Sequence, residues 1–232
     1  MTSLTSFAPG FHAVIIGASG GIGAAFADLL EADPAAGSVT RLSRATGLDL
    51  TDPHSITEAA AALAVPPDLV IVATGLLHAD GIAPERELRQ LSTDSFARAF
   101  AINATGPALV AQALLPLMPK GRKTLFAALS ARVGSIGDNR LGGWHAYRAS
   151  KSALNQIIRT IAIEQARKNP GSIVIGLHPG TVDTGLSKPF QRNVKTLFTP
   201  AESAAHLLRV IDAATPGWSG NLYDWKGESI PF

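Results

Sequence analysis

Two residues of the sequence could share proton-transfer chemistry. Tyr147 and Lys151 stand four positions apart in the run Tyr147-Arg148-Ala149-Ser150-Lys151. On a helix, residues at this spacing lie on one face, so the phenol and the ammonium can point into the same cleft. A free tyrosine titrates near pH ~10, and a nearby positive charge lowers that pKa. The pair predicts a group that exchanges a proton with a carbonyl or alcohol oxygen, although the same spacing also arises by chance in ordinary helices.

Two further polar residues stand where the predicted elements would bring them to a ligand. Ser130 follows the apolar run at residues 124–129, which predicts a place at the carboxyl end of a strand, where open α/β sheets bind ligands. Its hydroxyl could hold a substrate oxygen or cap a turn. Asn103 lies within a run of helical composition, where asparagine is mildly disfavoured. We expect for it either a polar, water-bridging role or exposure to solvent.

A glycine-rich turn near the N-terminus has the composition of a phosphate-binding loop. Residues 17–23 read Gly-Ala-Ser-Gly-Gly-Ile-Gly and follow a β-branched run at 14–16. Glycines let backbone N–H groups approach a ligand, and the start of the following helix favours an anion. A tight turn without a ligand is the alternative. The pattern predicts that a dinucleotide pyrophosphate contacts Gly17, Ser19, Gly20, Gly21 and Ile22.

The end of the second predicted strand bears on the choice between NADP(H) and NAD(H). In NAD-binding proteins, an acidic residue about 20 residues after the glycine turn usually bonds the ribose 2′-hydroxyl. Here the strand ends Arg41-Leu42-Ser43-Arg44, with guanidinium groups and no carboxylate. Because arginine can bind a 2′-phosphate in bidentate fashion, Ser43 and Arg44 favour NADP(H), with NAD(H) possible. A solvated arginine at the end of a strand is the alternative.

Taken in register, these motifs resemble the short-chain dehydrogenase/reductase family. The turn has that family's Gly-x-x-x-Gly-x-Gly spacing, and the order of its catalytic tetrad is matched by Asn103, Ser130, Tyr147 and Lys151. The segment at 178–184, His-Pro-Gly-Thr-Val-Asp-Thr, is similar to the family's Pro-Gly segment beside the nicotinamide. The resemblance covers essentially the whole chain. The family's C-factor-like branch is resembled by residues 130–151, 178–190 and 224–232.

The resemblance implies a reversible hydride transfer between a nicotinamide and a carbonyl or alcohol carbon. In that scheme Tyr147 exchanges the substrate proton, while Lys151 bonds the nicotinamide ribose and depresses the Tyr147 pKa. Ser130 would orient the carbonyl oxygen, and Asn103 would hold a water that links Lys151 to solvent.

Cofactor contacts in three further segments are also implied by the resemblance. Asp49 and Leu50 match the position that holds the adenine edge, although Asp49 could equally cap a helix that begins near Pro53. Residues 72–75, Val-Ala-Thr-Gly, stand where the family usually has asparagines after its fourth strand. The remaining expected contacts are Ala73, Thr74, Gly75, Tyr147, Lys151, Pro179, Gly180, Val182 and Thr184.

The substrate is only weakly encoded. The resemblance places a substrate loop at about residues 184–200. His78 could line the cofactor cleft or stand in a solvated loop, and His145 adjoins the tetrad at the start of a helix. The six histidines show no spacing typical of metal ligands, so we predict no metal site. Either an apolar wall or core and interface packing is expected of Leu141, Trp144, Leu186, Phe190 and Phe198.

The elements that must position these residues alternate along the chain. Continuous β-branched runs, typical of strands buried on both faces, occur at 14–16, 69–72, 124–126 and 173–175. Helical composition occurs at 22–30, 56–63, 92–115 and 146–167. This rhythm predicts one α/β domain over residues 1–232, a Rossmann-type, doubly wound, mostly parallel sheet with helices on both faces. A strand is also expected at 39–43, whereas any strand near 48–50 must be rudimentary, because a parallel crossover needs about a dozen residues.

Composition excludes several classes of protein. Of the 232 residues, 46% are hydrophobic and 16% are charged, which suits a packed core. The 20 basic and 18 acidic residues form no Lys/Arg block, which argues against a nucleic-acid partner. The chain has no cysteine, so disulfides and thiolate metal sites are excluded. The longest apolar stretch, around 107–119, is broken by prolines and falls short of the roughly 20 residues of a membrane span.

We therefore expect a cytoplasmic oxidoreductase that acts on a small carbonyl or alcohol, and residues 1–10 lack the features of a signal peptide. A homodimer or homotetramer is expected, because the helix with Ile157, Ile158, Ile161 and Ile163 is apolar on more than one side. The alternative is a dinucleotide-binding signalling or regulatory protein with little catalysis. A sugar epimerase or dehydratase is disfavoured, because those relatives carry a larger C-terminal domain and a different glycine spacing.

Overall fold

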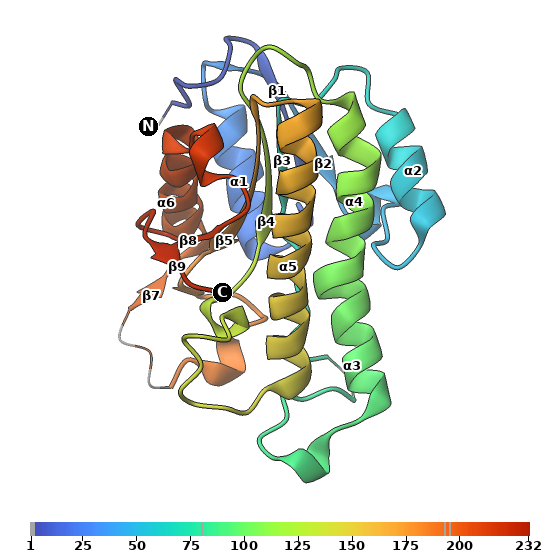
Figure 1. Ribbon diagram of the computed structural model, residues 1–232, viewed down its shortest axis with the longest axis vertical. Helices are drawn as coiled ribbons and strands as arrows, with labels where there is room; N and C mark the ends of the chain where they lie inside the picture. The colour runs from blue at the N-terminus through green and yellow to red at the C-terminus, as the bar shows by residue number, and fades with distance from the viewer. Residues whose placement is uncertain (1–2, 80, 193, 195) are drawn as a thin grey trace.

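The computed structural model describes residues 3–79, 81–192, 194 and 196–232. Its centre is a seven-stranded sheet with the order β2-β1-β3-β4-β5-β8-β9 (Figure 1). Neighbouring strands are parallel except for the last pair. The sheet contains β1 (Phe11–Ile16), β2 (Ala36–Leu42), β3 (Leu69–Val72), β4 (Thr124–Leu129), β5 (Ser172–His178), β8 (Leu222–Asp224) and β9 (Ser229–Ile230). A separate parallel pair is formed by β6 (Thr181–Val182) and β7 (Leu197–Phe198).

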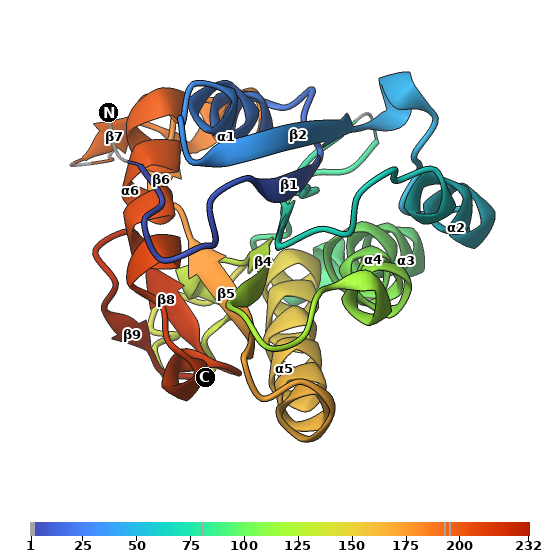
Figure 2. The same cartoon turned by 90° about the horizontal axis from the view of Figure 1, so that it is seen from above.

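Helices cover both faces of the sheet (Figure 2). One face carries α1 and α6, which pack against each other, and the other carries α2, α4 and α5. Each face has its own core of apolar side chains. The predicted doubly wound α/β fold is therefore confirmed. The helices are α1 (Gly21–Glu31), α2 (Pro53–Ala61), α3 (Thr93–Phe100), α4 (Gly106–Leu114), α5 (His145–Lys168) and α6 (Pro200–Ala213).

The strand β2 forms one edge of the sheet. In the part of the chain that the structure describes, residues 48–50 form no strand, and Leu48 and Leu50 instead bury their side chains in the core beneath α2 and α4. Asp52 caps α2, because its carboxylate accepts a first-turn N–H at 2.9 Å. The alternative that Asp49 caps this helix is wrong, since Asp49 accepts hydrogen bonds from Thr51.

The helical segment before β4 agrees closely with the helical run predicted at residues 92–115. It runs from Thr93 to Leu117 through α3, a π-helical turn at Ala101–Thr105, and α4. Pro107 does not interrupt this segment, because it lies in the first turn of α4, where its missing N–H costs little. By length and composition this segment could cross a membrane, but core helices pass the same test, and it packs against α5 and α2.

The strand β1 lies between β2 and β3. The chain therefore adds β2 on one side of β1 and β3 on the other side, so the strand order reverses at β1. Open α/β sheets bind ligands in the crevice that forms at the carboxyl ends of the strands at such a reversal. The glycine turn follows β1, residues 73–75 follow β3, and Ser130 follows β4. The topology therefore brings three predicted binding segments to one edge.

Candidate functional site

A cleft of about 740 Å³ opens at this edge of the sheet, within the usual range of ligand pockets. Ser130 lines it together with most of the predicted dinucleotide site. Two predicted contacts lie behind the cleft, because Gly180 packs against Phe198 and Val182 is buried in β6. The predicted cofactor residues on its lining are Gly17, Ser19, Gly20, Gly21, Ile22, Ser43, Arg44, Asp49, Leu50, Ala73, Thr74, Gly75, Tyr147, Lys151, Pro179 and Thr184.

The glycine turn has the shape that a bound pyrophosphate requires. A Cβ on Gly17, whose φ is +86°, would lie 2.8 Å from Thr74 Cγ2, and a Cβ on Gly21 would lie 2.9 Å from Thr184 Cγ2. The first-turn N–H groups of α1 have no acceptor within the helix, so they can bind an anion. The Thr74 hydroxyl on the same lining is buried without a hydrogen-bond partner among the described residues. The residues present therefore fit a dinucleotide.

The two arginines at the end of β2 have different environments. The Arg41 guanidinium forms two ion pairs, from Nε to Glu31 Oε1 at 2.8 Å and from Nη2 to Asp28 Oδ1 at 2.5 Å. The hydrogen bond to Glu31 raises the pKa of Arg41 above its ordinary value. Arg44 is exposed and lines the cleft. Arg41 therefore belongs to a surface ion-pair network, and Arg44 is the residue that can meet a 2′-phosphate.

Tyr147 and Lys151 lie on one face of α5, as their spacing predicts, and both line the cleft. The buried Lys151 ammonium donates a 2.7 Å hydrogen bond to the Leu129 carbonyl and lies 5.9 Å from the centre of the Tyr147 ring. Burial disfavours both charged forms: it lowers the pKa of Lys151 to about 7 and raises the pKa of Tyr147 to about 12. The expected depression of the Tyr147 pKa by Lys151 is wrong for this structure, because desolvation outweighs the attraction of the ammonium.

Ser130 is buried, and its hydroxyl donates a 2.6 Å hydrogen bond to the side-chain oxygen of Asn155. The Asn155 amide nitrogen in turn donates to the Gly134 carbonyl, which fixes the orientation of the amide. With its proton committed to Asn155, Ser130 Oγ can accept a hydrogen bond from the cleft. Sequence reasoning missed Asn155, although it continues the four-residue spacing of Tyr147 and Lys151 along one helix face.

Asn103 holds the loop that follows β3. Its side-chain amide exchanges two 2.8 Å hydrogen bonds with the Leu76 backbone and donates a third, at 3.0 Å, to Ser150 Oγ. Its position in the π-helical turn is typical of functional sites. A Cβ on Gly75 would lie 3.8 Å from Asn103 Oδ1 and 3.9 Å from Lys151 Nζ, so both polar groups lie close to the Gly75 backbone. The water-bridging role of Asn103 stays a prediction.

Aromatic side chains form one wall beside Tyr147. The centre of the Trp144 ring lies 6.2 Å from that of Tyr147 and 5.1 Å from that of Phe190. The His78 ring lies 5.7 Å from Phe190, and its Nε2 is 3.0 Å from the Gly185 carbonyl oxygen. His78 lines the cleft, so the alternative of a purely solvated loop histidine is wrong.

The other predicted substrate residues are divided between the cleft and the rest of the molecule. Leu186 lines the cleft. Phe198 is buried against His206, so the core-packing alternative holds for it, and Leu141 is 92% exposed and does not line the cleft. His145 is the first residue of α5 and is half-buried. Within the predicted substrate loop at 184–200, positions 193 and 195 lie outside the described residues.

Comparison with known proteins gives the family. A family model described as enoyl-(acyl carrier protein) reductase matches residues 17–216, most of the chain. A 1-hydroxy-2-glutathionyl-2-methyl-3-butene dehydrogenase from Rhodococcus is 34% identical over 181 residues, which cover 78% of this chain and 76% of that protein. The chain belongs to the short-chain dehydrogenase/reductase family. It is therefore an oxidoreductase of that family, as the motifs predict.

Other likenesses agree with this placement. The C-signal protein of Myxococcus xanthus is 38% identical over 136 residues, 59% of this chain and 78% of that protein, which confirms the similarity to the C-factor-like branch. An NADPH-bound carbonyl reductase from chicken fatty liver shares the fold, with a TM-score of 0.82, 22% identity, and coverage of 98% of this chain and 97% of that one. A Burkholderia multivorans short-chain dehydrogenase/reductase with bound NADP has a TM-score of 0.78 and 28% identity, covering 97% of this chain and 100% of that one.

The cleft is also lined by residues of this short-chain dehydrogenase/reductase that the sequence analysis did not identify. Arg98 and Ile102 reach it from the helix that carries Asn103. Their four-residue spacing beside a predicted tetrad residue is the signal that could have indicated them. Among the residues that the structure describes, no group of three His, Asp or Glu side chains forms a metal site.

Proposed function

We propose that this enzyme transfers a hydride between NADP(H) and the carbon of a carbonyl or alcohol substrate, with Tyr147 as the proton donor or acceptor. The observation that carries the proposal is that Tyr147 and Lys151 open onto the same cleft as the glycine turn. Reduction of a carbonyl delivers a hydride to carbon and a proton to oxygen, so it needs a dinucleotide site and an acid side by side.

The chain offers a binding group for each part of the cofactor. The glycine turn and α1 would hold the pyrophosphate, Arg44 the 2′-phosphate, and Asp49 and Leu50 the adenine edge. Lys151 would bond the nicotinamide ribose, and Pro179, Gly180, Val182 and Thr184 belong to the segment proposed beside the nicotinamide. When bound, the nicotinamide supplies or accepts the hydride. Arg44 and the NADP-bound structural neighbours support NADP(H) over NAD(H).

The proton chemistry favours carbonyl reduction at neutral pH. Burial raises the pKa of Tyr147 to about 12, so its phenol holds a proton that it can donate to a carbonyl oxygen as that oxygen gains charge. Lys151, whose pKa is about 7, supplies a positive charge beside the phenol when it is protonated. Ser130, oriented by Asn155, would hold the substrate oxygen, and Asn103 would fix the loop after β3.

The substrate class follows from the wall beside Tyr147. Trp144, Phe190, His78 and Leu186 present aromatic and apolar surface next to the proton donor. We propose a carbonyl compound with an apolar substituent, covered by the substrate loop at 184–200. Such surfaces bind apolar groups by removing them from water, while the few polar groups fix the orientation.

The test is an assay of NADPH oxidation against a panel of aliphatic and aromatic carbonyl compounds, run with the wild type and with Tyr147→Phe. We expect turnover in the wild type and its loss in Tyr147→Phe, with NADPH affinity retained. Tyr223, the second of the two tyrosines, provides the matched control, because Tyr223→Phe makes the same change away from the cleft. Full turnover in Tyr147→Phe would refute the assignment.

A dinucleotide-binding signalling or regulatory role is the second candidate, supported by the likeness to the protein named C-signal. In that role, the protein would bind NADPH without oxidising it in the presence of carbonyl compounds. The same panel therefore separates the two candidates.

We also propose a homodimer or homotetramer that acts in the cytoplasm. Ile158 on α5 is buried in the core, whereas Ile163 on the same helix is 48% exposed, which leaves apolar surface for a second copy. The mass of the protein in solution and cell fractionation test these two points.

A further inference from the structure

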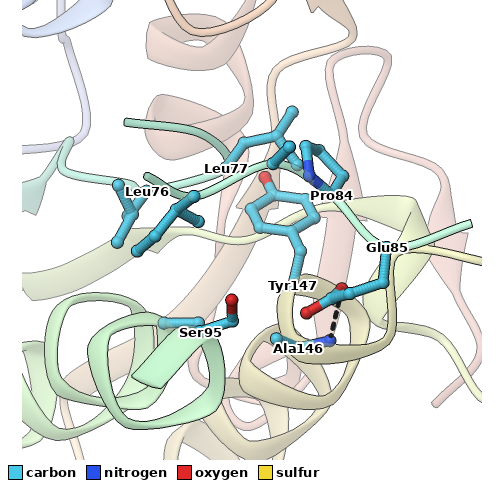
Figure 3. Close-up of a pocket in the computed structure, with 10 residues that line it drawn as sticks. Leu76, Leu77, Pro84, Glu85, Ser95, Ala146 and Tyr147 are labelled. Carbon is cyan, nitrogen blue, oxygen red and sulfur yellow. Dashed lines mark hydrogen bonds between the residues drawn. The ribbon is translucent and has the colours of Figure 1, made fainter. Parts of the chain in front are cut away.

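A buried glutamate from outside the predicted site binds the start of the helix that carries Tyr147. Glu85 lies in the loop between β3 and α3, and its side chain is only 4% exposed. One carboxylate oxygen accepts a 3.2 Å hydrogen bond from the Ala146 N–H, and the Glu85 backbone carbonyl accepts a 2.5 Å hydrogen bond from the Trp144 N–H. Figure 3 shows the carboxylate directly above the Ala146 nitrogen, near the backbone end of the Tyr147 side chain. Glu85 therefore serves two N–H groups at the start of α5.

The start of α5 has no capping side chain of its own, so its first N–H groups need acceptors from another segment. Its N-cap position is occupied by Trp144, which offers no side-chain oxygen and has a left-handed backbone with φ 54°. Trp144 is the one residue other than glycine with positive φ among those the structure describes, and this conformation is costly for a bulky side chain. The first N–H groups of a helix need outside acceptors, and a carboxylate also interacts favourably with the positive end of the helix dipole.

The presence of Trp144 at the N-cap position is explained by the contacts of its ring. Its ring packs edge-on against the ring of Tyr147, which lines the cleft, and against the ring of Phe190. A serine, threonine or aspartate would cap the helix better but would remove that ring. The cap must then come from another segment, and Glu85 provides it.

The second oxygen of Glu85 distinguishes this contact from an ordinary cap. Oε1 is buried and has no hydrogen-bond partner among the described residues. It borders a small cavity of about 10 Å³, lined also by Ser95 and Tyr147 and large enough for about one water molecule. The carboxylate thus reaches the surroundings of Tyr147 as well as the backbone in front of it.

We propose that Glu85 is a positioning residue for Tyr147: by capping α5 from the β3–α3 loop, it fixes the helix turn that presents the Tyr147 phenol to the cleft. This inference rests on the proposed function. Catalysis depends steeply on the position of the proton donor, and a displacement of about 1 Å can cost on the order of 100-fold in rate. Most of the proposed nucleotide contacts, by contrast, come from the glycine turn, Arg44 and Asp49, which are outside α5.

The test compares Glu85→Ala, Glu85→Gln and Glu87→Ala. Glu87 lies two residues further along the same loop, in an exposed ion pair with Arg89, so its replacement is the matched control. Glu85→Ala is expected to lower kcat by about 10- to 100-fold while the Kd for NADPH changes less than about twofold. Glu85→Gln keeps an oxygen that can accept from Ala146 and should restore most of kcat. Amide hydrogen exchange of the first turn of α5 should be faster in Glu85→Ala and near wild type in Glu85→Gln.

Two outcomes would overturn the proposal: an unchanged exchange rate at the start of α5 in Glu85→Ala, or a kcat for that variant equal to that of Glu87→Ala. A loss of stability with normal kcat, measured well below the unfolding temperature, would also reduce Glu85 to a purely structural role. If the wild type itself shows no turnover, the proposed function fails, and the exchange measurement still decides whether Glu85 caps the helix.

Discussion

Replacing Lys151 with methionine should stabilise this protein at neutral pH and remove its activity. The ammonium is buried at the edge of β4, and burial lowers its pKa from 10.5 to about 7. A lysine that prefers the neutral form in the folded state costs stability wherever the unfolded chain still holds the proton. Methionine has a similar length and no charge, so it removes this cost.

The size of the effect depends on pH in a defined way. With a pKa of 10.5 unfolded and about 7 folded, the penalty is about 4 kcal/mol at pH 7 and about 1 kcal/mol at pH 10. The wild type therefore gains stability relative to Lys151→Met as the pH rises through this window. The variant also leaves the Leu129 carbonyl without its hydrogen bond, which costs about 1–3 kcal/mol at every pH. The stability difference between the two proteins should therefore change by about 3 kcal/mol between pH 7 and pH 10. This change reports the charge of Lys151 alone, because the cost of the lost hydrogen bond is the same at both pH values.

Urea denaturation of both proteins at pH 7 and pH 10 measures this difference. Lys120→Met provides the control, because Lys120 is exposed and the same substitution there should shift stability by less than about 0.5 kcal/mol. A stability difference between Lys151→Met and wild type that stays constant from pH 7 to pH 10 would refute the reasoning. It would mean that the ammonium is solvated or paired in the folded protein.

Three other predictions concern the cleft. Arg44→Ala should weaken NADPH binding by about 10- to 100-fold and leave NADH binding nearly unchanged, as a charge-assisted contact to a 2′-phosphate requires; isothermal titration measures both. Asn155→Ala should lower kcat several-fold with little change in NADPH affinity, because the Ser130 hydroxyl loses its fixed acceptor; steady-state kinetics separate the two effects. Because Tyr147 has a pKa of about 12, the rate of alcohol oxidation at saturating NADP should rise with pH between 7 and 10, while carbonyl reduction shows no matching rise; parallel pH profiles test this.

The fold could be predicted from the sequence because local patterns and topology agree. The apolar runs of β1, β3 and β4 are buried along their whole length, and the glycine turn follows β1 as its spacing requires. The helix from Thr93 to Leu117 follows from its composition, but the π-helical turn at Ala101–Thr105 within it could not be predicted. Such a turn depends on the packing of the helix and has no reliable local signature.

The site was predictable where function depends on sequence spacing and unpredictable where it depends on contacts between distant segments. The spacing of Tyr147 and Lys151 placed both on the cleft, but the direction of the Tyr147 pKa depends on burial, which spacing does not report. Glu85 is 61 residues away from Ala146 in sequence, so only the three-dimensional structure shows its contact with α5. For Phe198 the sequence leaves an apolar wall and core packing both open, and only the structure shows that its side chain packs against His206.

Several departures from ordinary protein structure lie near the cleft, although buried hydroxyls without a partner also occur at the amino ends of β4 and β5, at Thr124 and Ser172. A left-handed tryptophan (Trp144), a buried lysine (Lys151), a threonine hydroxyl without a partner (Thr74), an asparagine in a π-helical turn (Asn103) and a glutamate with an unpaired oxygen (Glu85) all lie around the cleft. Each one costs stability, and natural proteins tolerate such costs chiefly where function requires them. A protein that used this fold only as a scaffold would gain stability by losing these features. The buried Lys151 and the unpaired Thr74 hydroxyl both line the cleft, and the proposed catalytic role gives these two costs a reason.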